Sequence, residues 1–115
     1  MLTMRLSALA GWRILLLAAA AGICWLAFTP NPPPIGESVW DKFQHLFAFG
    51  VLALPAHRAY PRARVARHVG ALLAFGIFIE LVQSQIPQRS AEVADVLADL
   101  CGVLLVLPLR RWLTS

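Results

Sequence analysis

Four long apolar stretches, separated by short polar linkers, are the feature that most limits how this chain can fold. They occupy residues 9–28, 43–60, 69–86 and 93–109 of the 115 residues. Apolar residues make up 59% of the sequence and charged residues 14%, against about 45–50% and about 25% in soluble domains. A soluble domain of this size could not cover so much apolar surface, so each stretch is predicted to span a membrane. The expected fold is all-α: a single membrane domain, residues 1–115, forming a four-transmembrane-helix bundle.

The placement of the basic residues predicts how this bundle is oriented. Eight of the ten lie near the N-terminus, in the linker after the second stretch or at the C-terminus, namely Arg5, Arg13, Arg58, Arg62, Arg64, Arg67, Arg110 and Arg111. These segments hold no acidic residue, whereas all six acidic residues lie on the other side with Lys42 and Arg89. Since cytoplasmic loops are enriched in Lys and Arg, the predicted orientation is N-in and C-in. The net charge of +4 then reflects membrane orientation, and no nucleic-acid partner is expected.

Two of the stretches allow more than one interpretation. The first could be a secretory signal peptide, with Ala18-Ala19-Ala20 as a cleavage site. Its apolar run continues well beyond these alanines, which favours an uncleaved span. In the second stretch, Pro55 is expected to kink the helix or to end its regular part.

The polar residues that could do chemistry gather at the helix ends predicted to face outside. In chain order they are Asp41, Lys42, His45, Glu80, Gln83, Arg89, Glu92, Asp95 and Asp99. At about 100° per residue, positions three or four apart share one face of a helix, so each of three helices presents a polar stripe. Gly76 and Gly102 continue two of the stripes, and small residues let neighbouring helices approach closely. The stripes are expected to form a polar pocket at the outer leaflet side.

Simpler explanations exist for most of these residues. Interface markers, helix-dipole partners, a core hydrogen bond or a loop charge would account for Asp41, Lys42, His45, Arg89, Glu92 and Asp95. Glu80 and Asp99 are harder to explain in this way, because each lies inside an apolar stretch. A carboxylate placed there must be protonated or must have a partner.

The ordered set of polar residues resembles the VanZ-like family of small bacterial membrane proteins. The motifs that carry the resemblance are Asp41-Lys42-x-x-His45, Glu80-x-x-Gln83, Pro87-x-Arg89 and Glu92-x-x-Asp95-x-x-x-Asp99-x-x-Gly102. The resemblance covers about residues 40–109, and this chain has Asp99 where the family usually has Asn. The founding member is associated with reduced sensitivity to teicoplanin, a glycopeptide that binds peptidoglycan precursors. The resemblance implies a multi-pass protein of the bacterial cytoplasmic membrane and cell envelope.

The favoured function is binding or modulation of a lipid or lipid-linked cell-wall headgroup. Arg89, Lys42 and His45 would contact its phosphate. The expected ligand-binding residues are Asp41, Lys42, His45, Glu80, Gln83, Arg89, Asp95 and Asp99. The expected partners are membrane lipids or a lipid-linked cell-wall precursor, and this function requires no cofactor or metal.

Two other functions remain open. In one, the chain is a membrane-embedded enzyme whose candidate catalytic residues are His45, Glu80, Asp95 and Asp99. They would act as acid and base or would bind a divalent metal. In the other, the polar residues lock the helices together and bind no ligand. Cys24 and Cys101 lie in apolar stretches and are interpreted as small core residues.

Overall fold

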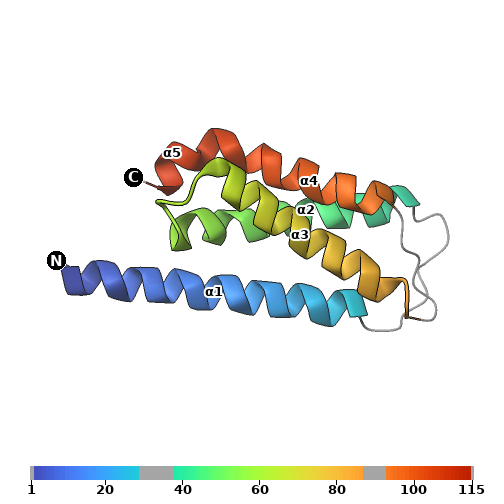
Figure 1. The fold of residues 1–115 in the computed structure, drawn as a ribbon, viewed down its shortest axis with the longest axis horizontal. Coiled ribbons are helices and arrows are strands. Elements are labelled where there is room, and N and C mark those ends of the chain that lie inside the picture. The colour runs from blue at the N-terminus through green and yellow to red at the C-terminus, as the bar shows by residue number, and fades with distance from the viewer. Residues whose placement is uncertain (1, 29–37, 87–92, 115) are drawn as a thin grey trace.

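The computed structural model of the protein describes residues 2–28, 38–86 and 93–114, and the described residues form helices and no strands. The four long helices are α1 (Leu2–Phe28), α2 (Ser38–Ala59), α3 (Val65–Gln83) and α4 (Val93–Val106). A short 3-10 helix, η1 (Leu107–Leu109), and α5 (Arg110–Leu113) follow. Figure 1 shows the long helices running along the horizontal axis in alternating directions, with both termini at the same end. The predicted all-α class is confirmed.

Two of the helices are long and apolar enough to cross a membrane. They are Arg5–Phe28 in α1 and Val65–Gln83, which is α3, each with a mean hydropathy of 1.8. The regular part of α4 has 14 residues. At 1.5 Å per residue it would measure about 21 Å, less than a hydrocarbon core of about 30 Å. Spanning by α2 and α4 therefore stays a prediction, and so does the N-in, C-in orientation.

Several helix ends differ from the predicted limits. Pro55 does not end α2, which continues through it to Ala59. A proline inside a helix removes one backbone hydrogen bond, and neighbouring helices can compensate for this loss. Helix α3 ends at Gln83, before the predicted limit at residue 86, and its chain continues in a turn. The regular part of α4 ends at Val106, because Pro108 is accommodated in the 3-10 helix that follows.

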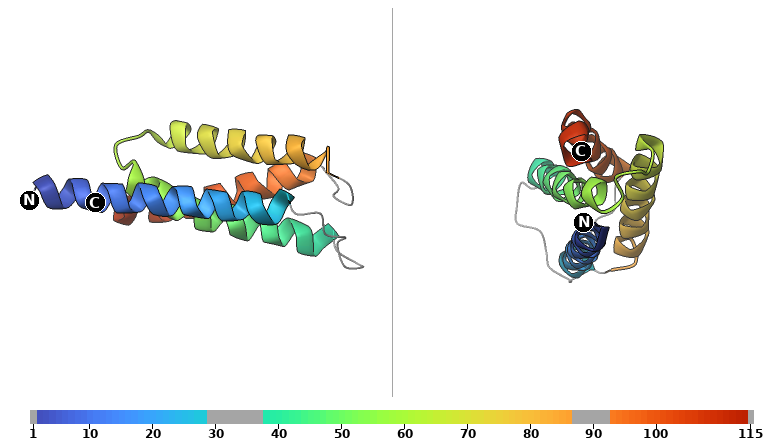
Figure 2. Two further views of the ribbon diagram at one scale, coloured as in Figure 1. Left: turned by 90° about the horizontal axis from the view of Figure 1, so that it is seen from below. Right: turned by 90° about the vertical axis from the view of Figure 1, so that its left-hand side faces the viewer.

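The core lies between α2, α3 and α4. Its buried apolar side chains are Phe49, Leu52, Ala53, Ala56, Leu72, Ile79, Val103 and Val106. Seen along the bundle, α1 and α4 lie on opposite sides, with α2 and α3 between them (Figure 2). Helix α1 contributes partly buried small and apolar residues, among them Ala19, Ala20 and Ile23. The packing of α2 on α4 is the most extensive contact between any two helices described.

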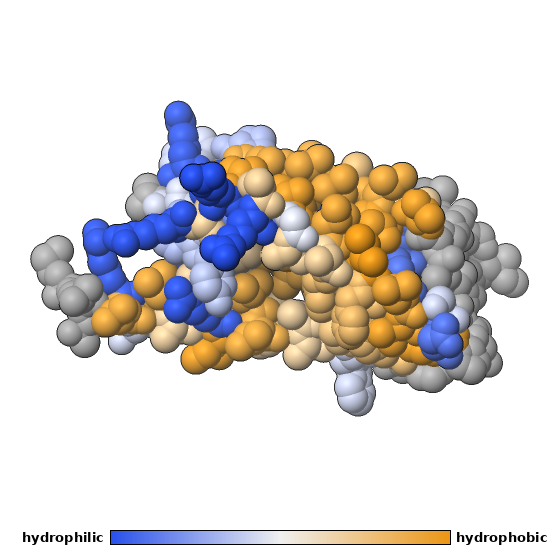
Figure 3. Space-filling view, in the orientation of Figure 1, coloured by the Kyte–Doolittle hydropathy of each residue, from blue (hydrophilic) through white to orange (hydrophobic). Residues whose placement is uncertain are grey.

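Apolar side chains also cover much of the outer surface. Trp25 is 75% exposed, Leu17 69% and Leu105 64%. On the face shown in Figure 3, apolar side chains form a broad band over the middle of the bundle, and strongly hydrophilic ones gather at the end that carries the termini. Such a surface suits a lipid surrounding better than water.

Two glycines allow the close approach of α4 to its neighbours. A Cβ at Gly102 would overlap the backbone carbonyl oxygen of Leu46 and would lie 3.0 Å from the Gly50 nitrogen. A Cβ at Gly76 would lie 2.7 Å from Asp99 Oδ2. The expectation that Gly76 and Gly102 permit close helix packing is confirmed. Both contacts lie beside the polar residues of the predicted pocket.

Candidate functional site

Six predicted site residues lie at the end of the bundle opposite the termini. The beginning of α2, the end of α3 and the beginning of α4 all lie at this end (Figure 1). We refer to their side chains together as the outer cluster: Lys42, His45, Glu80, Gln83, Asp95 and Asp99. Glu80, Gln83, Asp95 and Asp99 are buried, and Lys42 and His45 are partly buried. The three polar stripes therefore converge as the sequence predicts.

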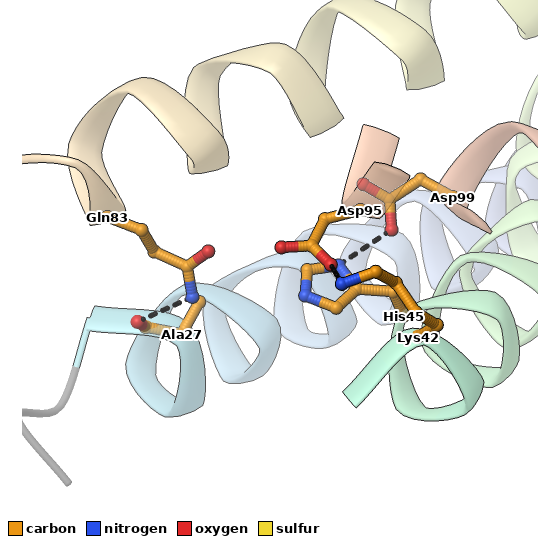
Figure 4. Close-up of polar contacts among 6 residues, drawn as sticks. All are labelled: Ala27, Lys42, His45, Gln83, Asp95 and Asp99. Carbon is orange, nitrogen blue, oxygen red and sulfur yellow. Dashed lines mark hydrogen bonds and ion pairs between the residues drawn. The ribbon is translucent and has the colours of Figure 1, made fainter. Parts of the chain in front are cut away.

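One ion pair and one hydrogen bond join α2 to α4 within the outer cluster. Lys42 Nζ lies 2.7 Å from Asp95 Oδ1, and His45 Nδ1 lies 2.9 Å from Asp99 Oδ1 (Figure 4). Both aspartates are fully buried. An ionised carboxylate can only accept a hydrogen bond, so Nδ1 of His45 is the donor. Lys42 and His45 of α2 are thus held by the aspartates of α4.

Glu80 brings α3 into the same site. Single ligand atoms of Glu80, His45 and Asp95 all lie within 4.8 Å of one another. Glu80 is 7% exposed and comes from the last turns of α3, next to the core residue Ile79. The three helices therefore each supply at least one ionisable group to one small volume.

Gln83 connects the cluster to α1. Its Nε2 donates a hydrogen bond to the backbone carbonyl of Ala27, at 3.0 Å. Its Oε1 is buried and has no donor among the described residues. In the view of Figure 4, this oxygen is directed to the side on which Asp95 lies. Asp95 Oδ2 is also buried, and the described part of the chain offers it no hydrogen-bond donor.

Within the described part of the chain, the outer cluster therefore contains two buried acceptors that lack donors, Gln83 Oε1 and Asp95 Oδ2. An unsatisfied buried acceptor costs about 1–3 kcal/mol, and more if it is charged. A ligand that brings donors or positive charge would remove this cost.

Three of the predicted residues cannot be placed in the cluster. Arg89 and Glu92 lie outside the described residues. Asp41 belongs to the first turn of α2, but its side chain is not among those described.

A second polar cluster, at the end that carries the termini, was not predicted. We call His57, His68 and Arg110 the inner cluster. The rings of the two histidines lie 4.3 Å apart, and Arg110 Nη1 lies 2.9 Å from His57 Nδ1. Arg110 also donates to the Ala63 carbonyl at 2.6 Å, and His68 Nε2 to the Tyr60 carbonyl at 3.0 Å. His57 is fully buried and His68 nearly so.

A sequence signal for the inner cluster did exist. His57 follows the buried residues Phe49 and Ala53 at intervals of four, and His68 precedes Leu72 and Gly76 at the same interval. Residues four apart share one face of a helix, so both histidines could have been placed on core-facing stripes.

Comparison with known proteins supports the family resemblance. A model of the VanZ/LLP1 family matches residues 13–113, which extends the resemblance into most of α1. Neither the search of curated proteins nor the search of solved structures returned a match. The family and the two apolar helices point to a membrane protein. The matched segment includes the whole outer cluster, and the chain belongs to the VanZ/LLP1 family.

Proposed function

We propose that this chain is an integral membrane protein of the bacterial cell envelope that binds the polar headgroup of a lipid or of a lipid-linked cell-wall intermediate. The headgroup would bind in the outer cluster. Four spans with N-in, C-in orientation would place this cluster at the outer leaflet. The family match, the apolar outer surface and the location of both termini at the arginine-rich end support this arrangement.

The observation that carries the proposal is a pair of buried acceptors, Gln83 Oε1 and Asp95 Oδ2, to which no described residue donates. Buried polar groups are normally hydrogen-bonded, and exceptions are frequent at binding sites. These two atoms lie at the helix ends where α3 and α4 meet α2, in a chain whose other buried side chains are mostly apolar. A headgroup with hydroxyl or amine donors, such as a sugar or an ethanolamine, would satisfy both.

The contacts with Asp95 and Asp99 change the role expected for Lys42 and His45. Lys42 and His45 were expected to contact a phosphate, but the structure pairs them with Asp95 and Asp99. To bind a phosphate directly, both side chains would have to leave aspartates that are fully buried. Removing one partner of a buried pair costs about 3–5 kcal/mol. The cluster therefore favours headgroup donors over direct phosphate contacts by Lys42 and His45.

Identification of co-purified lipids by mass spectrometry tests the proposal. The variants are Gln83→Leu and Asp95→Asn, and the matched control is Gln85→Leu, two residues along the chain with an exposed side chain. We expect wild type and Gln85→Leu to retain the same enriched headgroup class, and both site variants to lose it. Lipid compositions equal to the bulk membrane in every preparation would refute headgroup binding.

A second candidate function is acid–base catalysis on the same headgroup. It is favoured by the contact between His45 and Asp99 together with the proximity of Glu80. A carboxylate that accepts from Nδ1 holds a histidine in the orientation needed for proton transfer at Nε2. Incubation of purified protein with envelope lipids should then yield a product that the His45→Gln variant does not form. A wild-type preparation that converts no lipid would exclude this candidate.

A further inference from the structure

We propose that the outer cluster holds one divalent transition-metal cation, ligated by His45, Glu80 and Asp95. Metal binding itself stands on the geometry described below. Any role of the ion in holding a headgroup rests on the proposed function.

The distances between the three ligand groups suit one metal ion. One atom from each lies within 4.8 Å of the other two. Metal–nitrogen and metal–oxygen bonds of about 2.0–2.2 Å place two ligands at most about 4.4 Å apart. Small side-chain rotations would close this difference. The ligands come from α2, α3 and α4, so one ion would join all three core helices.

Asp99 orients the histidine for this role. Because Nδ1 of His45 donates to Asp99 Oδ1 at 2.9 Å, the neutral ring carries its lone pair on Nε2. In Figure 4, this second ring nitrogen lies on the side of the ring away from Asp99. A carboxylate behind a ligating histidine is the usual arrangement at metal sites. The negative charge of Asp99 makes His45 a stronger ligand.

A second observation, separate from the distances between the ligand atoms, also fits a cation. Asp95 Oδ2 and Gln83 Oε1 are buried acceptors with no donor in the part of the chain that the structure describes. Both are oxygen atoms, and a cation can be bound by oxygens that no protein donor reaches. The mixture of one imidazole with carboxylates suits Zn²⁺ or Mn²⁺ better than Ca²⁺, which binds oxygen ligands.

Lys42 would compete with the metal. Its ammonium lies 2.7 Å from Asp95 Oδ1, and its side chain is 24% exposed, whereas Asp95 is fully buried. A metal ion bound to Asp95 would replace the ammonium as the partner of the buried carboxylate, so the long, partly exposed lysine could then turn toward solvent. Metal binding should therefore weaken the Lys42–Asp95 pair, and removal of the ammonium should strengthen metal binding.

Titration of metal-free protein with Zn²⁺ and Mn²⁺ in detergent tests the inference. Calorimetry gives the affinity, and elemental analysis after gel filtration gives the stoichiometry. We expect about one equivalent in wild type, and affinity at least about tenfold lower in Glu80→Gln and Asp95→Asn. Asp99→Asn should weaken binding by about 10- to 100-fold, as removal of a carboxylate behind a ligating histidine does. Lys42→Met should bind more tightly than wild type.

His68→Gln is the matched control, because His68 lies in the inner cluster at the other end of the bundle. Its metal affinity should equal that of wild type. Lys42→Met keeps the test informative even if a carboxylate variant folds poorly. The inference is overturned if wild type binds no more tightly than Glu80→Gln, or if His68→Gln reduces binding as much as the cluster variants.

Lipid analysis of the same preparations, with and without a chelator, separates the two proposals. Metal binding without an enriched headgroup would refute the proposed function and leave the metal site standing. An enriched headgroup in a protein that binds no metal would refute the metal site and leave the proposed function standing.

Discussion

The two ends of the bundle bury histidines in opposite surroundings. At the outer end, His45 donates to the carboxylate of Asp99. At the inner end, His57 accepts from the guanidinium of Arg110, because a guanidinium can only donate. The same residue type is thus held by an anion at one end and by a cation at the other.

The two ends differ in which buried polar atoms lack a hydrogen-bond partner among the described residues. Inner-end donors reach backbone carbonyls at and just after the end of α2. Arg13 donates to the Ala59 carbonyl at 3.1 Å, His68 to that of Tyr60 and Arg110 to that of Ala63. One ring nitrogen, Nε2 of His57, has no acceptor among the described residues. The outer end instead has two buried acceptors, Gln83 Oε1 and Asp95 Oδ2, that no described residue reaches with a donor. We interpret the inner cluster as a clamp on the α2–α3 linker and the outer cluster as the ligand site.

The largest expected effect is that of Gly102→Ala at the outer end. The added Cβ would overlap the Leu46 backbone, so α4 would have to move away from α2. We expect a loss of about 3 kcal/mol in the free energy of unfolding, at the upper end of overpacking costs. Unfolding in mixed SDS micelles measures it.

Gly70→Ala is the control for this prediction, because nothing lies within 4 Å of a Cβ there. It should be neutral or stabilise the helix by up to about 1 kcal/mol. Equal losses in both variants would show that the close contact at Gly102 is not what holds the outer end together.

Next in size is Arg110→Gln, which tests whether the inner cluster is a clamp. The buried His57 would lose its donor and Ala63 its hydrogen bond, at a cost of about 1–3 kcal/mol. The control is Arg111→Gln, whose side chain is exposed. The same unfolding assay should show little change for the control. A stable Arg110→Gln variant would remove the proposed difference between the ends.

A smaller effect on stability is expected for Asp99→Asn and Glu80→Gln. These two variants test whether the outer cluster binds a ligand or only holds the helices together. Asparagine keeps an acceptor for His45, and both changes remove buried charge, so we expect stability to fall by about 1 kcal/mol or less. Headgroup retention should fall in both variants while folded yield is kept. If yield and retention fall together, the outer cluster is a structural lock and the contrast with the inner end fails.

The smallest expected effect is that of Arg58→Ala at the inner end. Its guanidinium lies 5.4 Å from the Trp12 ring centroid, and exposed cation–π contacts contribute about 0.5–1 kcal/mol. Arg62→Ala, also exposed, serves as the control in the same assay. A loss as large as that of Arg110→Gln would mean that the clamp extends beyond the inner cluster.

Most of the fold and much of the outer cluster could be predicted from the sequence. The apolar stretches correspond to the four long helices, although α3 and α4 end earlier than predicted. The convergence of His45, Glu80 and Asp95 followed from residue spacing and from helices that alternate in direction. The inner cluster was not predicted. Residue spacing could place His57 on a core-facing stripe, but it could not show that Arg110, 53 positions away, would lie beside it.

The sequence by itself determined which face of each helix is polar and at which end the acidic residues gather. These properties depend on residue spacing along one helix, and the backbone sets that spacing locally. Only the tertiary structure decided the partners: Lys42 with Asp95, His45 with Asp99, and Arg110 with His57. Partner choice depends on how far each helix is shifted along its neighbour. That shift is set by packing between helices, including the close contact of Gly102 with the α2 backbone. Such packing joins residues far apart in the sequence, so the pattern within one helix cannot predict it.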